Sequence, residues 1–174
     1  MRKQLLEIPA GPLGTAATIR KMQGLVSRGK RDPEILNLAA SIVKNSGTRA
    51  RDHLNEVGAI YKYINSRMNY IWDPVGVETI YSPKQALRRG AGDCDCLSTL
   101  FNTMAEAIGL RTVFVTIKDP NYPTRYSHVY SRVYIPERRQ WVNVDLANKD
   151  EGMGWEHMRA KIPGATKIWR GSRG

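Results

Sequence analysis

The sequence contains few cysteines and no long apolar run, and both absences limit what the chain can be. Only Cys94 and Cys96 are present, as a Cys-x-Cys pair. A disulfide between residues two apart would close a strained ring, so we expect no disulfide-stabilised secreted domain. No apolar run approaches the roughly 20 residues of a membrane span, and the apolar stretch after Met1 is too short for a secretory signal. We therefore expect a cytoplasmic setting and no membrane span.

Sequence repeats and phosphate-binding glycine loops are also missing. Nothing recurs at a fixed period, which argues against a solenoid. Gly90-Ala91-Gly92 lacks the further glycine or the Lys-Ser/Thr pair of known phosphate-binding loops. Apolar residues make up 41% of the 174 residues and charged residues 25%, so the chain can build a core. The length fits one domain with short extensions.

Positive charge is concentrated at the two ends of the chain. The formal net charge is +11, yet residues 52–151 carry twelve cations and twelve acids. Residues 1–51 carry ten cations against three acids, and residues 152–174 carry five against one. This distribution predicts a neutral working domain whose basic ends meet an acidic partner or polyanion. A solvated basic surface without a partner explains it equally well.

The apolar pattern predicts helices first and a small sheet afterwards. Capping residues and apolar spacing indicate helices near residues 15–27, 33–44, 50–68, 83–87 and 94–108. Alternating runs indicate an antiparallel meander of strands at residues 112–117, 128–134 and 141–144. This order is typical of an α+β fold, with a helical N-terminal part packed against a small antiparallel sheet. We expect an arm at residues 1–14, a domain at residues 15–150 (helical lead 15–68, core 69–147) and a basic tail at residues 151–174.

Cys94 stands where a nucleophilic thiol would be expected. It follows Gly92-Asp93 at the start of the strongest predicted helix. The helix dipole and the unpaired N–H groups there favour a thiolate, so this position predicts a lowered thiol pKa. The same N–H groups can receive a developing oxyanion. Inert packing at a helix start is the competing interpretation.

His128 and Asp145 are the candidate partners of this thiol. His128 opens one predicted strand and Asp145 ends the next, and the two strands are expected to be hairpin neighbours. A hydrogen bond between them would fix the imidazole tautomer and stabilise the imidazolium. Together the three residues predict an activated nucleophile with its base and the group that orients the base.

Three short motifs in this order resemble the transglutaminase-like cysteine-hydrolase superfamily, most closely its short bacterial and tailed-phage members. They are Gly92-Asp93-Cys94-Asp95, Ser127-His128-Val129 and Val142-Asn143-Val144-Asp145. The stretch from Trp72-Asp73-Pro74 through Glu78, and from Ser82-Pro83 to Gly90, is similar to what precedes the cysteine in phage members. The resemblance covers residues 69–147. It implies a papain-like core with a catalytic triad of Cys94, His128 and Asp145.

The sequence departs from this pattern at two points. Many relatives have an acid two residues after the nucleophile, where this chain has Cys96. We expect Cys96 to be a packed neighbour, or a resolving thiol if the site is redox-sensitive. Relatives often complete the oxyanion site with an upstream side chain, for which Trp72 and Gln85 are the candidates here.

The resemblance implies a thiol-dependent acyl-transfer enzyme that needs no cofactor and acts on a protein or peptide substrate. It would be a cysteine protease or amidase, or alternatively a transglutaminase. A non-catalytic structural or adaptor protein of a phage virion is the main competing hypothesis, and a basic nucleic-acid-associated protein is another. A zinc site using Cys94, Cys96 and a histidine is disfavoured, because Cys-x-Cys is an unusual spacing and no second pair exists.

Overall fold

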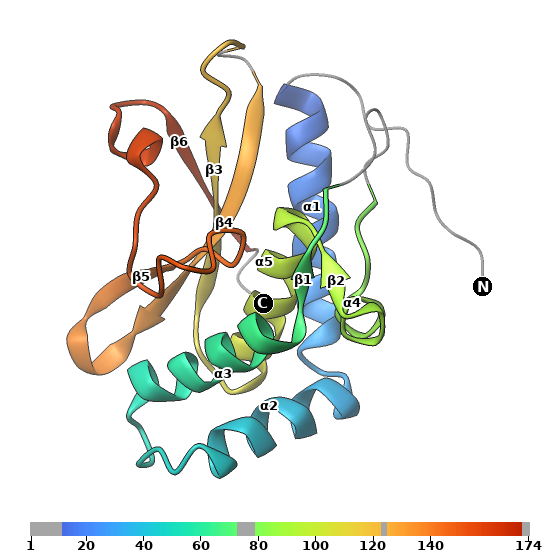
Figure 1. The fold of residues 1–174 in the computed structure, drawn as a ribbon, viewed down its shortest axis with the longest axis vertical. Coiled ribbons are helices and arrows are strands. Elements are labelled where there is room, and N and C mark those ends of the chain that lie inside the picture. Colours follow the sequence, from blue (N-terminus) through green and yellow to red (C-terminus); the bar gives the residue numbers. More distant parts are fainter. Residues whose placement is uncertain (1–11, 73–78, 123–124, 172–174) are drawn as a thin grey trace.

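Five α-helices, four of which start at a capping residue visible in the sequence, form one part of the described chain. The computed structural model describes residues 12–72, 79–122 and 125–171 (Figure 1). The helices are α1 (Pro12–Gly29), α2 (Pro33–Asn45), α3 (His53–Arg67), α4 (Pro83–Arg89) and α5 (Cys94–Ala107). The last four are N-capped by side chains of Asp or Ser, which accept from N–H groups of the first turn: Asp32, Asp52, Ser82 and Asp93. The expected helices are therefore confirmed, and α1 begins three residues earlier than expected.

A four-stranded antiparallel sheet forms the other part. Its strands are β3 (Thr112–Lys118), β4 (Tyr126–Ile135), β5 (Gln140–Val144) and β6 (Thr166–Arg170), in the spatial order β5-β4-β3-β6. The meander of β3, β4 and β5 is as the alternation predicts. Strand β6 comes from the C-terminal segment that the pattern left unassigned, and it pairs with β3 along the full length of β6.

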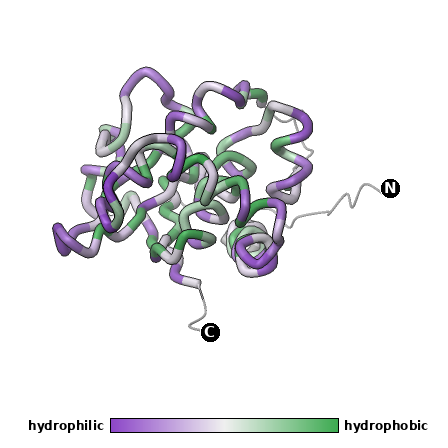
Figure 2. The backbone as a smooth tube through the Cα atoms, turned by 90° about the horizontal axis from the view of Figure 1, so that it is seen from below, coloured by the Kyte–Doolittle hydropathy of each residue, from purple (hydrophilic) through white to green (hydrophobic). Residues whose placement is uncertain are grey.

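Helix α5 lies between the other helices and the sheet and forms the centre of the core (Figure 1). Every residue of α5 from Cys96 to Ala105 is buried. Apolar residues of α2, α3, β4 and β5 pack with it in one cluster, and α1, β3 and β4 form a second cluster beside the start of α5. Figure 2 shows the same segregation, with apolar segments gathered inside and polar ones outside. The expected α+β fold is confirmed.

A short parallel pair, which the sequence did not predict, leads into α5. Strand β1 (Asn69–Tyr70) pairs with β2 (Ala91–Gly92), immediately before the helix that carries Cys94. Asp73, Pro74, Glu78, Pro123 and most of the expected N-terminal arm lie outside the described residues. Among the helices within the described ranges, none combines the length and apolar character that crossing a membrane requires.

Candidate active site

Cys94 is the first residue of α5, where the end of β2 passes close to the first turn of the helix. The Asp93 side chain accepts from the Cys96 N–H at 3.0 Å, and the first helical bond runs from Leu97 N–H to the Asp93 carbonyl. The N–H of Cys94 therefore precedes the hydrogen-bonded part of the helix. A Cβ on Gly92 would lie 2.6 Å from the Cys96 Cβ, so only glycine fits between β2 and α5.

The surroundings of Cys94 raise its thiol pKa, which makes the expectation of a lowered pKa wrong. Burial raises the pKa most, and the Asp95 and Asp93 carboxylates raise it further. The Val129 backbone N–H hydrogen-bonds to the sulfur and opposes this only in part. The Cys94 thiol can also donate a hydrogen bond to Asp95, because Sγ lies 3.8 Å from Oδ1. At rest the sulfur is therefore a thiol rather than a thiolate.

His128 and Asp145 form the hydrogen-bonded pair that the strand order predicts. His128 Nε2 lies 2.8 Å from Asp145 Oδ2, with the side chains 17% and 4% exposed. Burial raises the pKa of the Asp145 carboxyl, but hydrogen bonds from His128, Asn148 and the Ala147 N–H outweigh this and lower it. The ionised carboxylate then accepts from Nε2–H, so the neutral ring presents Nδ1 as its proton acceptor.

The loop after β5 is held in place from both sides, and this fixes Asp145. Asn148 Nδ2 donates to Asp145 Oδ2 at 2.8 Å, and the Ala147 N–H donates to Oδ1 at 3.1 Å. The Lys149 ammonium donates to the carbonyls of Asn65 and Met68 at the C-terminal end of α3. Helix α3 thereby anchors the loop that carries the acid.

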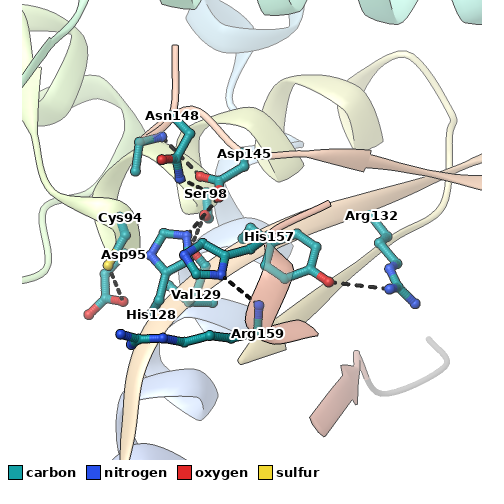
Figure 3. Close-up of polar contacts among 12 residues, drawn as sticks. Cys94, Asp95, Ser98, His128, Val129, Arg132, Asp145, Asn148, His157 and Arg159 are labelled. Carbon is teal, nitrogen blue, oxygen red and sulfur yellow. Dashed lines mark hydrogen bonds and ion pairs between the residues drawn. The ribbon is translucent and has the colours of Figure 1, made fainter. Parts of the chain in front are cut away.

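The structure brings Cys94 to the strand that carries His128. Cys94 packs against the apolar cluster that contains Val129, the residue directly after His128. In Figure 3 the His128 ring lies between Cys94 and Asp145. A thiol, an imidazole and a carboxylate thus meet where the start of α5 faces β4 and the end of β5. This arrangement can pass a proton from sulfur to imidazole while the acid stabilises the resulting cation.

Cys96 faces away from this group and is packed. It is 1% exposed, and its sulfur lies 3.5 Å from both the Thr79 carbonyl and the Tyr81 N–H. Burial raises the pKa of its thiol as well. Within the described ranges, no three His, Cys, Asp or Glu side chains cluster as metal ligands would.

Two residues that the sequence analysis did not select lie at the site. The His157 ring centroid is 6.2 Å from that of His128, and its Nδ1 accepts from the Arg159 N–H at 3.2 Å (Figure 3). Burial lowers the pKa of His157, and His128 and Arg159 lower it further. Tyr70 is the second residue, because the pairing of β1 with β2 sets it opposite Gly92, two residues before Cys94, and Cys94 is among the neighbours that raise the pKa of its phenol. The sequence around these two residues gave no sign of this role, since each is brought to the site by contacts with residues far away in the chain.

Comparisons with known proteins identify the family and the fold of this chain. A family model described as the transglutaminase-like superfamily matches residues 37–146. An inferred protease from Parabacteroides distasonis superposes with a TM-score of 0.54 at 15% identity, over 75% of this chain and 30% of that one. An inferred cysteine protease from Cytophaga hutchinsonii superposes with a TM-score of 0.52 at 16% identity, over 96% of this chain and 56% of that one. The chain therefore spans well under two thirds of either structure. No curated protein sequence matches it.

Proposed function

The chain belongs to the transglutaminase-like superfamily, and on that premise we propose that it is a thiol-dependent acyl-transfer enzyme acting on a peptide or carboxamide bond. Cys94, His128 and Asp145 would be its nucleophile, base and orienting acid. The observation that carries the proposal is the 2.8 Å bond from His128 Nε2 to a buried Asp145, together with the packing of Cys94 against the cluster that contains Val129, the next residue along β4. A structural role alone gives no reason to place these three groups together.

The reaction begins with the thiol protonated. His128 Nδ1 takes the proton from Sγ as the sulfur attacks the carbonyl carbon, and a C–S bond forms. The carbonyl electron pair becomes an oxyanion, which the N–H of Cys94 receives. The oxyanion then collapses, the C–N bond breaks, and the imidazolium returns its proton to the departing amine. Asp145 stabilises the imidazolium throughout and stays ionised.

The acyl-enzyme is released by a second nucleophile. Water gives the carboxylic acid, and the outcome is proteolysis or deamidation; a primary amine gives a new amide, and the outcome is cross-linking. In both cases His128 takes a proton from the attacking molecule and returns it to the Cys94 sulfur. We favour water and a peptide substrate, because the two superposed structures are described as proteases.

The proposal is tested by acylation with p-nitrophenyl acetate, followed by mass mapping and by release with water or methylamine. Cys94→Ala should abolish acylation without changing the fold, whereas Cys96→Ser should retain it. Acylation that persists in Cys94→Ala, or that is lost equally in Cys96→Ser, would show that another thiol or no thiol reacts. A folded wild-type protein that is not acylated would favour the structural role of a virion component.

We also propose that the two basic ends bind one acidic partner together. Gln23 Nε2 of α1 donates to the Arg170 carbonyl of β6 at 2.8 Å, and Trp169 of β6 packs with the apolar face of α1. This contact joins the cation-rich N-terminal and C-terminal segments. Arg20, Lys167 and Arg170 are all exposed beside it.

Binding to heparin as a polyanion probe tests this second proposal. We expect binding that weakens steeply with salt and is reduced in the Arg20→Glu, Lys167→Glu double variant. Reversing two exposed cations elsewhere, with Lys62→Glu and Arg138→Glu, is the matched control for net charge. Equal losses in both double variants would contradict a shared site.

A further inference from the structure

The proposed reaction needs a second oxyanion donor, and neither side chain that the sequence offered is in place to supply it. Gln85 Oε1 accepts from the Ser82 N–H and hydroxyl at 3.1 and 2.9 Å, so it closes the capping box of α4. The Trp72 side chain is 79% exposed, and it packs edge-on against Tyr70 with ring centroids 5.3 Å apart. Tyr70, by contrast, lies opposite Gly92, two residues before Cys94.

The pairing of β1 with β2 fixes Tyr70 beside the nucleophile. Tyr70 is the register partner of Gly92, two residues before Cys94. The flanking N–H groups of Asn69 and Ile71 donate to the carbonyls of Gly90 and Gly92 at 2.8 and 3.1 Å. Paired strands lie about 4.8 Å apart, so the phenol is carried directly alongside the start of α5. Burial raises the pKa of the phenol there, and the nearby Cys94 raises it further.

We propose that Tyr70 is a catalytic residue whose hydroxyl, with the backbone N–H of Cys94, binds the oxyanion formed when the thiol attacks an acyl group. This inference rests on the proposed function and names a further group of the same site. When a carbonyl carbon bonds to Sγ, its oxygen comes within reach of the donors that surround the sulfur. The Tyr70 hydroxyl then donates a hydrogen bond to this oxygen and keeps its proton.

The electrostatic setting of Tyr70 suits a donor that stays neutral. Burial raises the pKa of its phenol, and the neighbouring Cys94 and Asp93 raise it further. A neutral phenol donates to an oxyanion without giving up its proton, as oxyanion donors do. The edge contact with Trp72 restricts the ring, so little reorganisation is needed when the oxyanion forms.

Two reactions of the same thiol separate an oxyanion donor from a residue that merely adjusts the sulfur. Acylation by p-nitrophenyl acetate passes through an oxyanion. Alkylation by iodoacetamide displaces iodide at a carbon and forms none. In Tyr70→Phe we expect Cys94 acylation to slow about 100-fold, the usual effect of losing one oxyanion donor. Alkylation at the same pH should change less than about fivefold, since the sulfur and its base remain.

Tyr134→Phe is the matched control, because it removes a phenol six residues beyond His128 on β4, about 20 Å away. Both rates should stay at the wild-type level in this control. Equal losses of acylation and alkylation in Tyr70→Phe would overturn the inference, because they would mean that Tyr70 acts on the thiol itself. Unchanged acylation would also overturn it, yet would leave the proposed function standing. If wild-type Cys94 is not acylated at all, both proposals fail.

Discussion

Asp145→Asn tests the proposed mechanism through the geometry of a single carboxylate. In the native protein Oδ2 accepts from His128 Nε2 and Asn148 Nδ2, and Oδ1 accepts from the Ala147 N–H. An asparagine has one acceptor oxygen and one NH₂ group, so it cannot accept on both sides. If its oxygen serves Ala147, its NH₂ faces His128 and Asn148. His128 must then accept through Nε2, and the Asn148 amide must turn to accept through Oδ1, which a side-chain amide can do and the Ala147 backbone N–H cannot. The ring proton moves to Nδ1, and the nitrogen facing the thiol loses its lone pair.

The opposite amide orientation is also unfavourable. The oxygen would still accept from His128, but the NH₂ would face the Ala147 N–H, donor against donor, in a site only 3% exposed. An unsatisfied buried group of this kind costs about 1–3 kcal/mol. We therefore expect the wrong tautomer to dominate and Cys94 acylation to slow by about 10³–10⁴, or roughly 4–5.5 kcal/mol.

The assay compares Cys94 acylation rates in wild type, Asp145→Asn and Asn148→Ala, with unfolding curves for each. Asn148→Ala is the matched control, because it removes one donor to the same carboxylate and keeps the acid. It should cost about tenfold or less, in line with one hydrogen bond of about 1 kcal/mol. A folded Asp145→Asn protein that loses less than tenfold would refute the reasoning and make Asp145 a structural residue.

Two further predictions follow from the same elements. The rate at which iodoacetamide alkylates Cys94 should rise with pH through an apparent pKa above the ~8.5 of a free thiol, since burial and Asp95 disfavour the thiolate. Asp95→Asn should move the midpoint of this pH profile downward. A wild-type midpoint below ~8.5 would contradict the raised pKa. Gly92→Ala should destabilise the protein by about 1–3 kcal/mol in denaturant unfolding, because its Cβ would meet a side chain at 2.6 Å. Gly58→Ala, in open space on α3, should instead stabilise the protein by up to about 1 kcal/mol. If both substitutions changed the free energy of unfolding in the same direction, the close contact at Gly92 would not be the cause.

The features that the sequence predicts are those written in local signals. Asp32 before Pro33 and Ser82 before Pro83 start helices because a capping oxygen and a fixed proline φ act within one turn. The meander follows from alternation and short connections between β3, β4 and β5. The pairing of His128 with Asp145 needs only that hairpin geometry, which is why residues 17 apart could be matched in advance.

The features that escaped prediction depend on contacts distant in sequence. Strand β6 has no clean alternation, and its place is set by β3, about 50 residues earlier, where Trp169 Nε1 donates to Thr116 Oγ1 at 2.8 Å. His157 reaches His128 because its segment is tied to the sheet: the Gly154 N–H donates to the Asn143 carbonyl at 2.8 Å. A polar residue in a loop gives no sign of such anchoring before the sheet is assembled.

The thiol pKa shows how a position at a helix start can suggest the wrong electrostatics. The helix dipole is a local effect that stabilises a charge near the helix end by about 0.3–1 kcal/mol at typical sites, and it can be inferred from sequence position alone. Desolvation depends on everything that packs around the sulfur, and here Asp93 and Asp95 add like charge on both sides of Cys94. A pre-formed thiolate–imidazolium pair is therefore disfavoured at rest. Under the proposed mechanism the thiolate forms only as the sulfur attacks, so we expect the position of the His128 proton and the oxyanion donors, rather than the resting thiol, to control the rate.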